Sequence, residues 1–406
     1  MRGKKWTITG WALYDFANTI FSMNIISLYF VLWVTIDKAG EDILYSIALS
    51  GSLFVAAVME PLLGTISDIY KKRMPFLIFF TCLACLLTIV LGGVKGVLIG
   101  LFVFALANIA FQTAAVFYNA LLAFICDRKE IGRVSGLGVG LGYVGAITGL
   151  LATKPFALKY GYQAAFIPTA VLFFIFSLPC FILVKETPPV NKLRPEMSMG
   201  KVYRRIKGTF VDSERYPGLR RFLLGAFIFL NAVNTAIVFM SVYVKKVGDF
   251  PDSELIPLYI VSTVMAIAGA LVSGIAADKL GAKRAVIASL VFWMFAIIAG
   301  SSAFTRPMFW TAGPLMGIAL GSIWTTSRAW VVKLCPEEKI GEVFGLLGTV
   351  GKSAAIVGPL VWGLSILVFG FMGVAKYRMA MLIQGFFILL GWLVIRGVPE
   401  DKAAAE

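Results

Sequence analysis

The chain has 406 residues, of which 59% are hydrophobic and only 15% charged, with a formal net charge of +15 and no histidine. Soluble chains are about 25% charged and about 45–50% apolar, so this composition excludes a soluble enzyme, a secreted scaffold and a nucleic-acid-binding domain. It indicates an all-α integral membrane protein. The absence of histidine excludes metal sites built on that ligand, and we expect no metal and no other cofactor.

Twelve segments are apolar over the roughly 20 residues that a helix needs to span a bilayer. In chain order they cover residues 11–36, 43–67, 74–92, 97–125, 134–155, 163–184, 221–244, 255–277, 285–303, 307–332, 340–369 and 377–395. We therefore predict twelve transmembrane helices as two pseudo-symmetric six-helix bundles. The predicted parts are an N-terminal bundle, a cytoplasmic linker, a C-terminal bundle and a short cytoplasmic tail, at residues 1–184, 185–220, 221–396 and 397–406.

The basic residues predict the orientation of these spans. When the spans alternate across the bilayer, most of the 37 lysine and arginine residues fall on the side that holds both termini. Cytoplasmic loops carry such an excess, so we expect a multi-pass protein of a prokaryotic cell membrane with both termini in the cytoplasm. Most of the net charge then reflects orientation.

The linker carries an amphipathic pattern. Val202, Ile206 and Phe210 recur every four residues, opposite lysine and arginine side chains. This pattern favours a helix over 198–210 that lies on the cytoplasmic lipid surface and is attracted to anionic head groups. A regulatory target segment is the alternative.

The two halves share motifs at an offset of about 210 residues, the signature of an internal repeat. A G-x-x-x-D pattern ends the second and the eighth span, as Gly64 to Asp68 and Gly274 to Asp278. An I-G-x-V-x-G-L pattern opens the fifth and the eleventh span, at Ile131 and Ile340. The same order of motifs at the same places in both halves predicts one six-helix unit used twice.

The G-x-x-x-D pattern, followed by basic residues, resembles a signature of the major facilitator superfamily. The resemblance implies a cytoplasmic latch in which the carboxylate caps the neighbouring helix and pairs with loop cations. Its residues here would be Gly64, Asp68, Gly274 and Asp278. Both copies depart from the family pattern: Lys71 stands where a glycine is usual, and Ala282 where a basic residue is usual.

Three further elements narrow the resemblance. They are Trp11-Ala12-Leu13-Tyr14-Asp15-Phe16-Ala17-Asn18, then Phe117-Tyr118-Asn119-Ala120 followed by Gly132-Arg133-Val134-Ser135-Gly136-Leu137-Gly138, and Gly351-Lys352-Ser353-Ala354. Together they resemble the branch of the superfamily related to the autophagy-associated vacuolar amino-acid effluxers, with its bacterial members. The resemblance covers nearly the whole chain and implies a twelve-helix transporter of small solutes, without a firm substrate.

Charged residues inside spans mark candidate sites, because a charge in mid-bilayer costs at least ~2.5–3.5 kcal/mol. Lys352 lies about midway through its span, and we favour an anchor for a substrate anion over a structural ion pair. Asp15 is a candidate carrier of a coupling proton, with helix capping or pairing to a loop cation as an equal alternative. For Glu60 we favour structural pairing. Arg328 is the fourth such residue.

Polar side chains form a stripe on the fourth span. Asn108, Gln112, Ala115 and Asn119 share one helix face, and Gly317, Gly321, Trp324 and Arg328 repeat the spacing on the tenth. A polar stripe joins helices or lines a water-filled path. Because the resemblance implies that the first helix of each three-helix repeat lines the central cavity, we favour the path. Further candidates on the first and seventh spans are Asn18, Asn24, Asn231 and Asn234.

The glycines of the fifth and eleventh spans have a different expected role. We interpret them as packing and hinge positions, because small residues let helices approach and slide. They are Gly136, Gly138, Gly140, Gly142, Gly145 and Gly149 in the fifth span, with Gly345, Gly348, Gly351 and Gly358 in the eleventh.

These features favour a secondary active transporter of a small polar solute, an amino acid or a small organic anion or zwitterion, that works by alternating access with proton coupling. The expected partners are the solute, a coupling proton and the lipid bilayer, and we expect a monomer. A lipid or lysolipid flippase of the same fold is the alternative. A membrane enzyme or a receptor has less support, because the sequence offers no nucleophile–base pair and no soluble domain.

Overall fold

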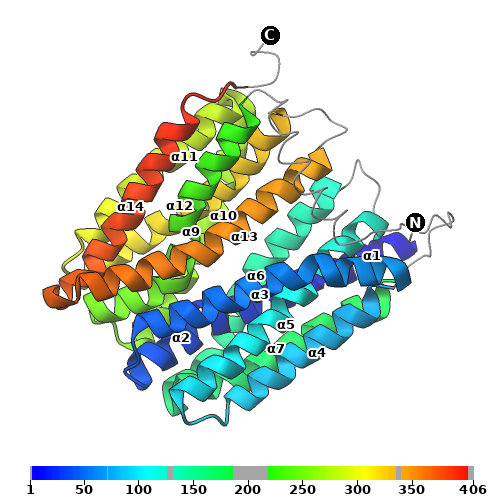
Figure 1. The fold of residues 1–406 in the computed structure, drawn as a ribbon, viewed down its shortest axis with the longest axis horizontal. Helices are drawn as coiled ribbons and strands as arrows, with labels where there is room; N and C mark the ends of the chain where they lie inside the picture. Colours follow the sequence, from blue (N-terminus) through cyan, green and yellow to red (C-terminus); the bar gives the residue numbers. More distant parts are fainter. Residues whose placement is uncertain (1, 71, 126–130, 186–217, 335–339, 401–406) are drawn as a thin grey trace. The chain divides into compact units, whose positions relative to one another are not determined.

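A computed structural model describes residues 2–70, 72–125, 131–185, 218–334 and 340–400, and every regular element in these ranges is helical (Figure 1). The long helices of the N-terminal half are α1 (Arg2–Phe21), α3 (Asp42–Tyr70), α4 (Met74–Leu91), α5 (Val97–Ile125), α6 (Ile131–Tyr160) and α7 (Phe166–Leu183). Those of the C-terminal half are α9 (Leu219–Gly248), α10 (Asp252–Leu280), α11 (Ala282–Ser301), α12 (Arg306–Lys333), α13 (Ile340–Val368) and α14 (Ala375–Ile395). Each predicted span from the second onward overlaps one of these helices, and the first, 11–36, begins in α1 and continues beyond it.

Within the described ranges, eleven helices are both long and apolar enough to cross a membrane. The remaining predicted span, 307–332, corresponds to α12, whose 28 residues extend about 42 Å. Glycine, serine and threonine lower its apolar character. It is therefore long enough to span a membrane but does not meet the hydropathy criterion that the other eleven helices meet. The expectation of an all-α membrane protein is confirmed.

The first span is one continuous helix from Lys5 to Asp37 whose winding changes along its length. After α1 the helix widens into π-helical turns at Ser22–Tyr29, returns to α at α2 (Phe30–Leu32) and widens again at Trp33–Asp37. Such turns often occur at functional sites. Asn24, in the first wide stretch, is fully buried, and its Nδ2 donates to the hydroxyls of Thr153 at 3.2 Å and Thr169 at 3.0 Å. The wide stretch is therefore joined to α6 and α7.

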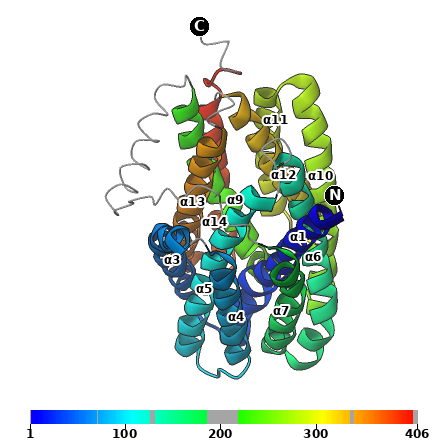
Figure 2. The same cartoon turned by 90° about the vertical axis from the view of Figure 1, so that its right-hand side faces the viewer.

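The chain forms two compact units, Met1–Gly200 and Lys201–Glu406. In the first, α1 packs on α6 and α7, α5 packs on α3 and α4, and α4 packs on α7. In the second, α9 packs on α13 and α14, α12 packs on α10 and α11, and α11 packs on α14. Figure 2 shows α3, α5 and α4 side by side in the first unit. The sequence repeat therefore corresponds to one set of helix pairs used twice.

The boundary between the units falls inside the predicted linker, 185–220. The amphipathic helix expected at 198–210 lies outside the described residues, so the proposed domain limits remain predictions.

Glycines bring α10 and α12 into close contact. A Cβ on Gly321 would lie against the Ala266 carbonyl oxygen and 2.9 Å from the Ala270 nitrogen, and one on Gly317 would lie against the Ser262 carbonyl. The sequence pattern predicts that these two glycines belong to a polar stripe that lines a path. The structure instead places them in a helix–helix contact, because only hydrogen in place of a side chain allows the backbones to come this near.

In each unit, a side chain from another element caps the C-terminal end of the third long helix, which is α4 in the first unit and α11 in the second. Gln163 Nε2 donates to the carbonyls of Leu91 and Val94 at the end of α4, at 2.8 and 2.5 Å. Arg378, at the start of α14, donates to the carbonyl of Ser301 and, at 2.6 Å, to that of Ala303 at the end of α11. The last carbonyls of a helix have no intrahelical donor, so both side chains satisfy groups that would otherwise lack a partner.

Replacement of the second cap is expected to destabilise the C-terminal unit. Arg378→Ala removes a charged donor from two carbonyls, with an expected loss of about 2 kcal/mol. That loss corresponds to roughly 4–8 °C in the melting temperature of a unit of this size. Lys376→Ala is the control, because the Lys376 ammonium lies over the Tyr377 ring at 5.4 Å rather than on a helix end. Equal melting temperatures for the two variants would refute the capping role.

Candidate functional site

An aromatic stack joins two of the sequence motifs in the N-terminal unit. The ring of Tyr118 on α5 stacks with the rings of both Trp11 and Tyr14 on α1, with centroid distances of 4.6 and 4.7 Å. Trp11 Nε1 donates to the Tyr118 carbonyl at 3.1 Å, and the Tyr14 hydroxyl hydrogen-bonds Thr81 Oγ1 on α4 at 2.7 Å. All three rings are buried. The motifs therefore form one contact that fixes α1 against α5 and α4.

The motif at 132–138, on α6, contacts α1 at Asp15 and Trp11. A Cβ on Gly138 would lie 2.8 Å from Asp15 Oδ2 and 2.9 Å from the Trp11 ring. The glycine therefore leaves the space that the carboxylate and the indole occupy. Asp15 is half-buried and interacts with other groups of the protein. We name Trp11, Tyr14, Asp15, Tyr118 and Gly138 the motif cluster.

The α1–α6 contact continues past the motif cluster through further glycines of α6. A Cβ on Gly142 would lie 2.7 Å from Thr19 Oγ1, one on Gly145 would lie against the Phe16 backbone, and one on Gly149 would lie 2.9 Å from Ile20. The packing role is thus confirmed for Gly138, Gly142, Gly145 and Gly149, and for Gly358, which packs on Asn231 and Thr235 of α9.

Other glycines of these two helices do not share this role in the described residues. A Cβ on Gly136, Gly140 or Gly348 would meet no atom within 4 Å, and one on Gly351 would lie 3.9 Å from Leu230. The packing interpretation is wrong for the exposed Gly136, Gly140 and Gly348, whereas Gly351 lies in ordinary contact with α9. The surroundings of Gly345 lie outside the described part of the chain.

The polar residues predicted on α5 differ in their surroundings. Asn108 is fully buried, and its Nδ2 donates to Ser52 Oγ of α3 at 2.7 Å. Gln112 is half-buried and Asn119 is exposed. Asn108 therefore joins two helices, whereas Asn119 is open to the surroundings of the unit. On α1, Asn18 has a buried Oδ1 without a hydrogen-bond partner in the described structure.

In the C-terminal unit, Asn234 of α9 contacts the turn of α13 that carries Lys352. Asn234 Nδ2 on α9 donates to the carbonyl of Gly351 at 3.2 Å, the residue before Lys352. Lys352 is half-buried and interacts with other groups of the protein. Asn231, one turn earlier on α9, donates to its own helix at Phe227, and its Oδ1 stays buried without a partner in the described structure.

On α12, Trp324 is half-buried and Arg328 is exposed. At the end of α10, Asp278 of the expected latch is exposed, and Gly274 lies near Thr325. The surroundings of Glu60, Gly64 and Asp68 lie outside the described part of the chain. The latch therefore remains a prediction.

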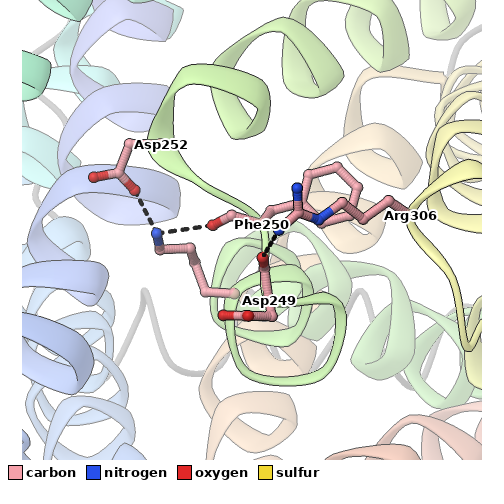
Figure 3. Close-up of polar contacts among 5 residues, drawn as sticks. Asp249, Phe250, Asp252 and Arg306 are labelled. Atoms are coloured by element: carbon pink, nitrogen blue, oxygen red, sulfur yellow. Dashed lines mark hydrogen bonds and ion pairs between the residues drawn. The ribbon is translucent and has the colours of Figure 1, made fainter.

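Sequence reasoning missed a cationic cluster at the α9–α10 connection (Figure 3). Lys245 Nζ lies 2.5 Å from Asp252 Oδ1 and donates to the Phe250 carbonyl at 2.9 Å. Arg306 at the start of α12 donates to the carbonyl of Asp249 at 3.1 Å. Asp249 has a positive φ of 47°, in the left-handed region. Lys245 and Arg306 thus hold this loop. The only sequence signal for the cluster is the presence of charged residues at the ends of the helices.

Sequence reasoning also missed Gln384 on α14. This side chain is 3% exposed, and neither of its amide atoms has a hydrogen-bond partner in the described structure. A lone glutamine in an apolar span is a detectable signal, because an unsatisfied amide in such a setting is costly.

Comparison with known proteins relates the whole chain to membrane transporters. Residues 31–406 match the family described as "Vacuole effluxer Atg22 like". The uncharacterized MFS-type transporter YxiO of Bacillus subtilis is 27% identical over 97% of this chain and 95% of its own. Autophagy-related protein 22 of Kluyveromyces lactis is 23% identical over 73% of this chain and 67% of its own.

Solved structures show the same fold at low sequence identity. A mutant of the nucleoside transporter NupG aligns with a TM-score of 0.78 at 13% identity, over 96% of this chain and 99% of the other. A bacterial homolog of the human lysosomal transporter Spinster aligns with a TM-score of 0.77 at 14% identity, over 97% of each chain.

Proposed function

The chain belongs to the Atg22-like vacuole effluxer family of major facilitator transporters, and we propose that it moves an amino acid, or a similar small zwitterion or organic anion, by proton-coupled alternating access. The observation that carries this proposal is the presence of two half-buried charges of opposite sign within spans, Asp15 on α1 and Lys352 on α13. Such charges are expensive in a bilayer and mark transport sites when they persist.

Lys352 is the proposed anchor for the anionic group of the solute. It follows Ile340, the first residue of α13, by about 18 Å at 1.5 Å per residue, near the middle of a ~30 Å hydrocarbon core. Asn234, which bonds the adjacent backbone, fixes that turn of α13 against α9. A lysine held in this way supplies a point charge to a carboxylate.

Asp15 is the proposed carrier of the coupling proton. The chain has no histidine, so a proton relay has to use carboxylates or hydroxyls. Asp15 is half-buried at the contact of α1 and α6, beside Gly138 and Trp11. A change in its charge alters a helix contact directly, which is what coupling of protonation to conformation requires.

The substrate class can be tested by ligand-induced stabilisation, since a binder raises the melting temperature by mass action. Purified protein is screened against amino acids, organic acids, sugars, nucleosides and lysolipids. A saturable rise confined to amino acids or organic acids supports the proposal. A rise confined to sugars or nucleosides contradicts it.

A lipid or lysolipid flippase is the second candidate. Arg328 presents an exposed guanidinium within α12, a suitable partner for a phosphate head group. Translocation of a fluorescent phospholipid in proteoliposomes, lost in Arg328→Gln, would favour the flippase. Inactivity toward every head group would eliminate it.

A substitution at Gly138 can move the Asp15 side chain while its carboxylate group stays chemically the same. Gly138→Ala puts a methyl group where Asp15 Oδ2 and the Trp11 ring now lie, so we expect proton-driven flux to fall about tenfold. Gly136→Ala, two residues earlier on α6 and with no atom within 4 Å, is the matched control and should transport normally. Normal flux in both variants would argue against a role for the position of Asp15.

We also propose that the protein resides in the cell membrane as a monomer, with both termini in the cytoplasm. The excess of basic residues on one side supports this orientation. Labelling of single cysteines, placed at each terminus, by an impermeant maleimide tests it: labelling in intact cells would contradict the proposal.

A further inference from the structure

Two glycines bring the beginning of α9 and the end of α14 into close contact. A Cβ on Gly225 would lie against the Ile395 side chain and 3.4 Å from the Gly391 carbonyl oxygen. Small residues allow the backbones of two membrane helices to come this near. Arg221 and Arg396 flank the contact, one on each helix, so both arginines stand at the same end of the pair. We call Arg221, Gly225, Gly391 and Arg396 the α9–α14 junction.

Arg221 is held in place by the backbone at the end of α14. Its Nε donates to the carbonyl of Val394 at 2.7 Å, one of the last carbonyls of a helix, which have no intrahelical donor. A Cβ on Gly397 would lie 2.6 Å from both Cζ and Nη1 of Arg221, so the guanidinium rests on the chain just after α14. Arg221 is exposed, and its terminal nitrogens have no acceptor among the described residues.

Arg396 is held by an aromatic ring of its own helix. Its guanidinium carbon lies 5.1 Å from the centroid of the Trp392 ring, a cation–π contact, and the side chain is exposed. The next described acidic residue along the chain, Glu400, is engaged elsewhere. Its carbonyl accepts from Trp330 Nε1 at 3.1 Å, and its carboxylate lies against Gly281. Within the described part of the chain, the junction therefore presents two positioned guanidinium groups without a carboxylate partner.

Exposed leucines lie next to each arginine on the bilayer side. Leu224 follows Arg221 by three residues on α9 and is 55% exposed, and Leu393 precedes Arg396 by three residues on α14 and is 43% exposed. Residues three apart are neighbours on a helix surface, so each guanidinium stands beside an apolar side chain. A phospholipid has the same order, a charged phosphate followed by acyl chains.

We propose that the α9–α14 junction binds the phosphate of an anionic phospholipid, with the acyl chains along Leu224 and Leu393. Guanidinium groups bind phosphate through paired N–H donors, and basic pockets between membrane helices hold acidic head groups. The lipid joins the ends of α9 and α14 from outside the unit, as a bound partner and not as cargo. Binding here does not depend on which solute the protein moves.

Thermal unfolding of the purified, delipidated full chain in mixed detergent micelles tests this site. Dioleoylphosphatidylglycerol is expected to raise the melting temperature by a few degrees, with saturation. Dioleoylphosphatidylcholine has the same acyl chains and phosphodiester, but its choline cation cancels the charge, so it should give no saturable rise. Inorganic phosphate lacks the acyl chains and should have no effect either.

Substitution of one guanidinium tests whether the effect arises at the junction. Arg396→Gln should raise the half-saturating amount of phosphatidylglycerol about tenfold, the change expected from the loss of one charged hydrogen bond. Arg396→Lys keeps the charge but loses the planar donor fork, so its value should be intermediate. Lys246→Gln removes the same charge in the last turn of α9, at the opposite end of the helix, and should respond like the native protein.

Four results would overturn the proposal. They are an equal response to phosphatidylglycerol and phosphatidylcholine, an equal response to inorganic phosphate, an unchanged half-saturating amount in Arg396→Gln, or no saturable response of the native protein to phosphatidylglycerol. If Arg396→Gln does not fold, the comparison of the two phospholipids on the native protein decides alone.

Discussion

Gly145→Ala is expected to disrupt the N-terminal unit more than any other single methyl group added to α6. A Cβ at this position would lie on the Phe16 carbonyl oxygen and 2.9 Å from both Phe16 C and Cα. These are backbone atoms that cannot rotate away, so α1 and α6 have to separate. Overpacking costs about 1–3 kcal/mol and occasionally more, and we expect a value near 3 kcal/mol.

Gly140→Ala is the matched control in the same helix. A Cβ on Gly140 meets no atom within 4 Å, and alanine gains up to about 1 kcal/mol of helix propensity over glycine. Melting temperature and monodispersity in detergent should fall for Gly145→Ala and be unchanged or improved for Gly140→Ala. Equal behaviour would mean that the α1–α6 contact does not support the fold.

Lys352→Ala and Asp15→Asn are expected to abolish proton-driven flux while the protein remains folded. Lys352→Ala removes the proposed anchor for the solute, so the loss should appear in apparent affinity and in rate. Asp15→Asn keeps the shape of the side chain but cannot exchange a proton, so coupled flux should fall while exchange without a gradient persists. We expect losses of at least about tenfold in each case.

The control for these variants is Lys159→Ala. Lys159 is exposed in the last turn of α6, where it lies over the Tyr160 ring at 5.0 Å. Its removal should leave flux unchanged. Wild-type flux in both Lys352→Ala and Asp15→Asn would show that neither residue belongs to the transport site.

Helix positions were predictable because the bilayer imposes a minimum apolar length on every span. The predicted 97–125 coincides with α5, and 340–369 differs from α13 by one residue. The winding of the first span was not predictable, since apolar length does not distinguish α from π turns. The caps by Gln163 and Arg378 also escaped prediction, because two different side chains fill the same role and leave no shared pattern.

The site was only partly accessible to sequence reasoning. The motifs of α1, α5 and α6 pointed to the right segments, but the stack of Trp11, Tyr14 and Tyr118 depends on packing between helices. Periodicity placed Asn108 and Asn119 on one face, yet the first is buried against α3 and the second is exposed. Exposure changes along a helix of 29 residues, and periodicity is blind to that change.

Solute uptake into proteoliposomes under an imposed proton gradient tests the account most directly. A radiolabelled amino acid or organic acid selected by the stability screen should accumulate only while the gradient lasts. A protonophore should abolish accumulation, and Asp15→Asn should show none. Accumulation that is unchanged by the protonophore, or absent for every amino acid and organic acid, would contradict the account.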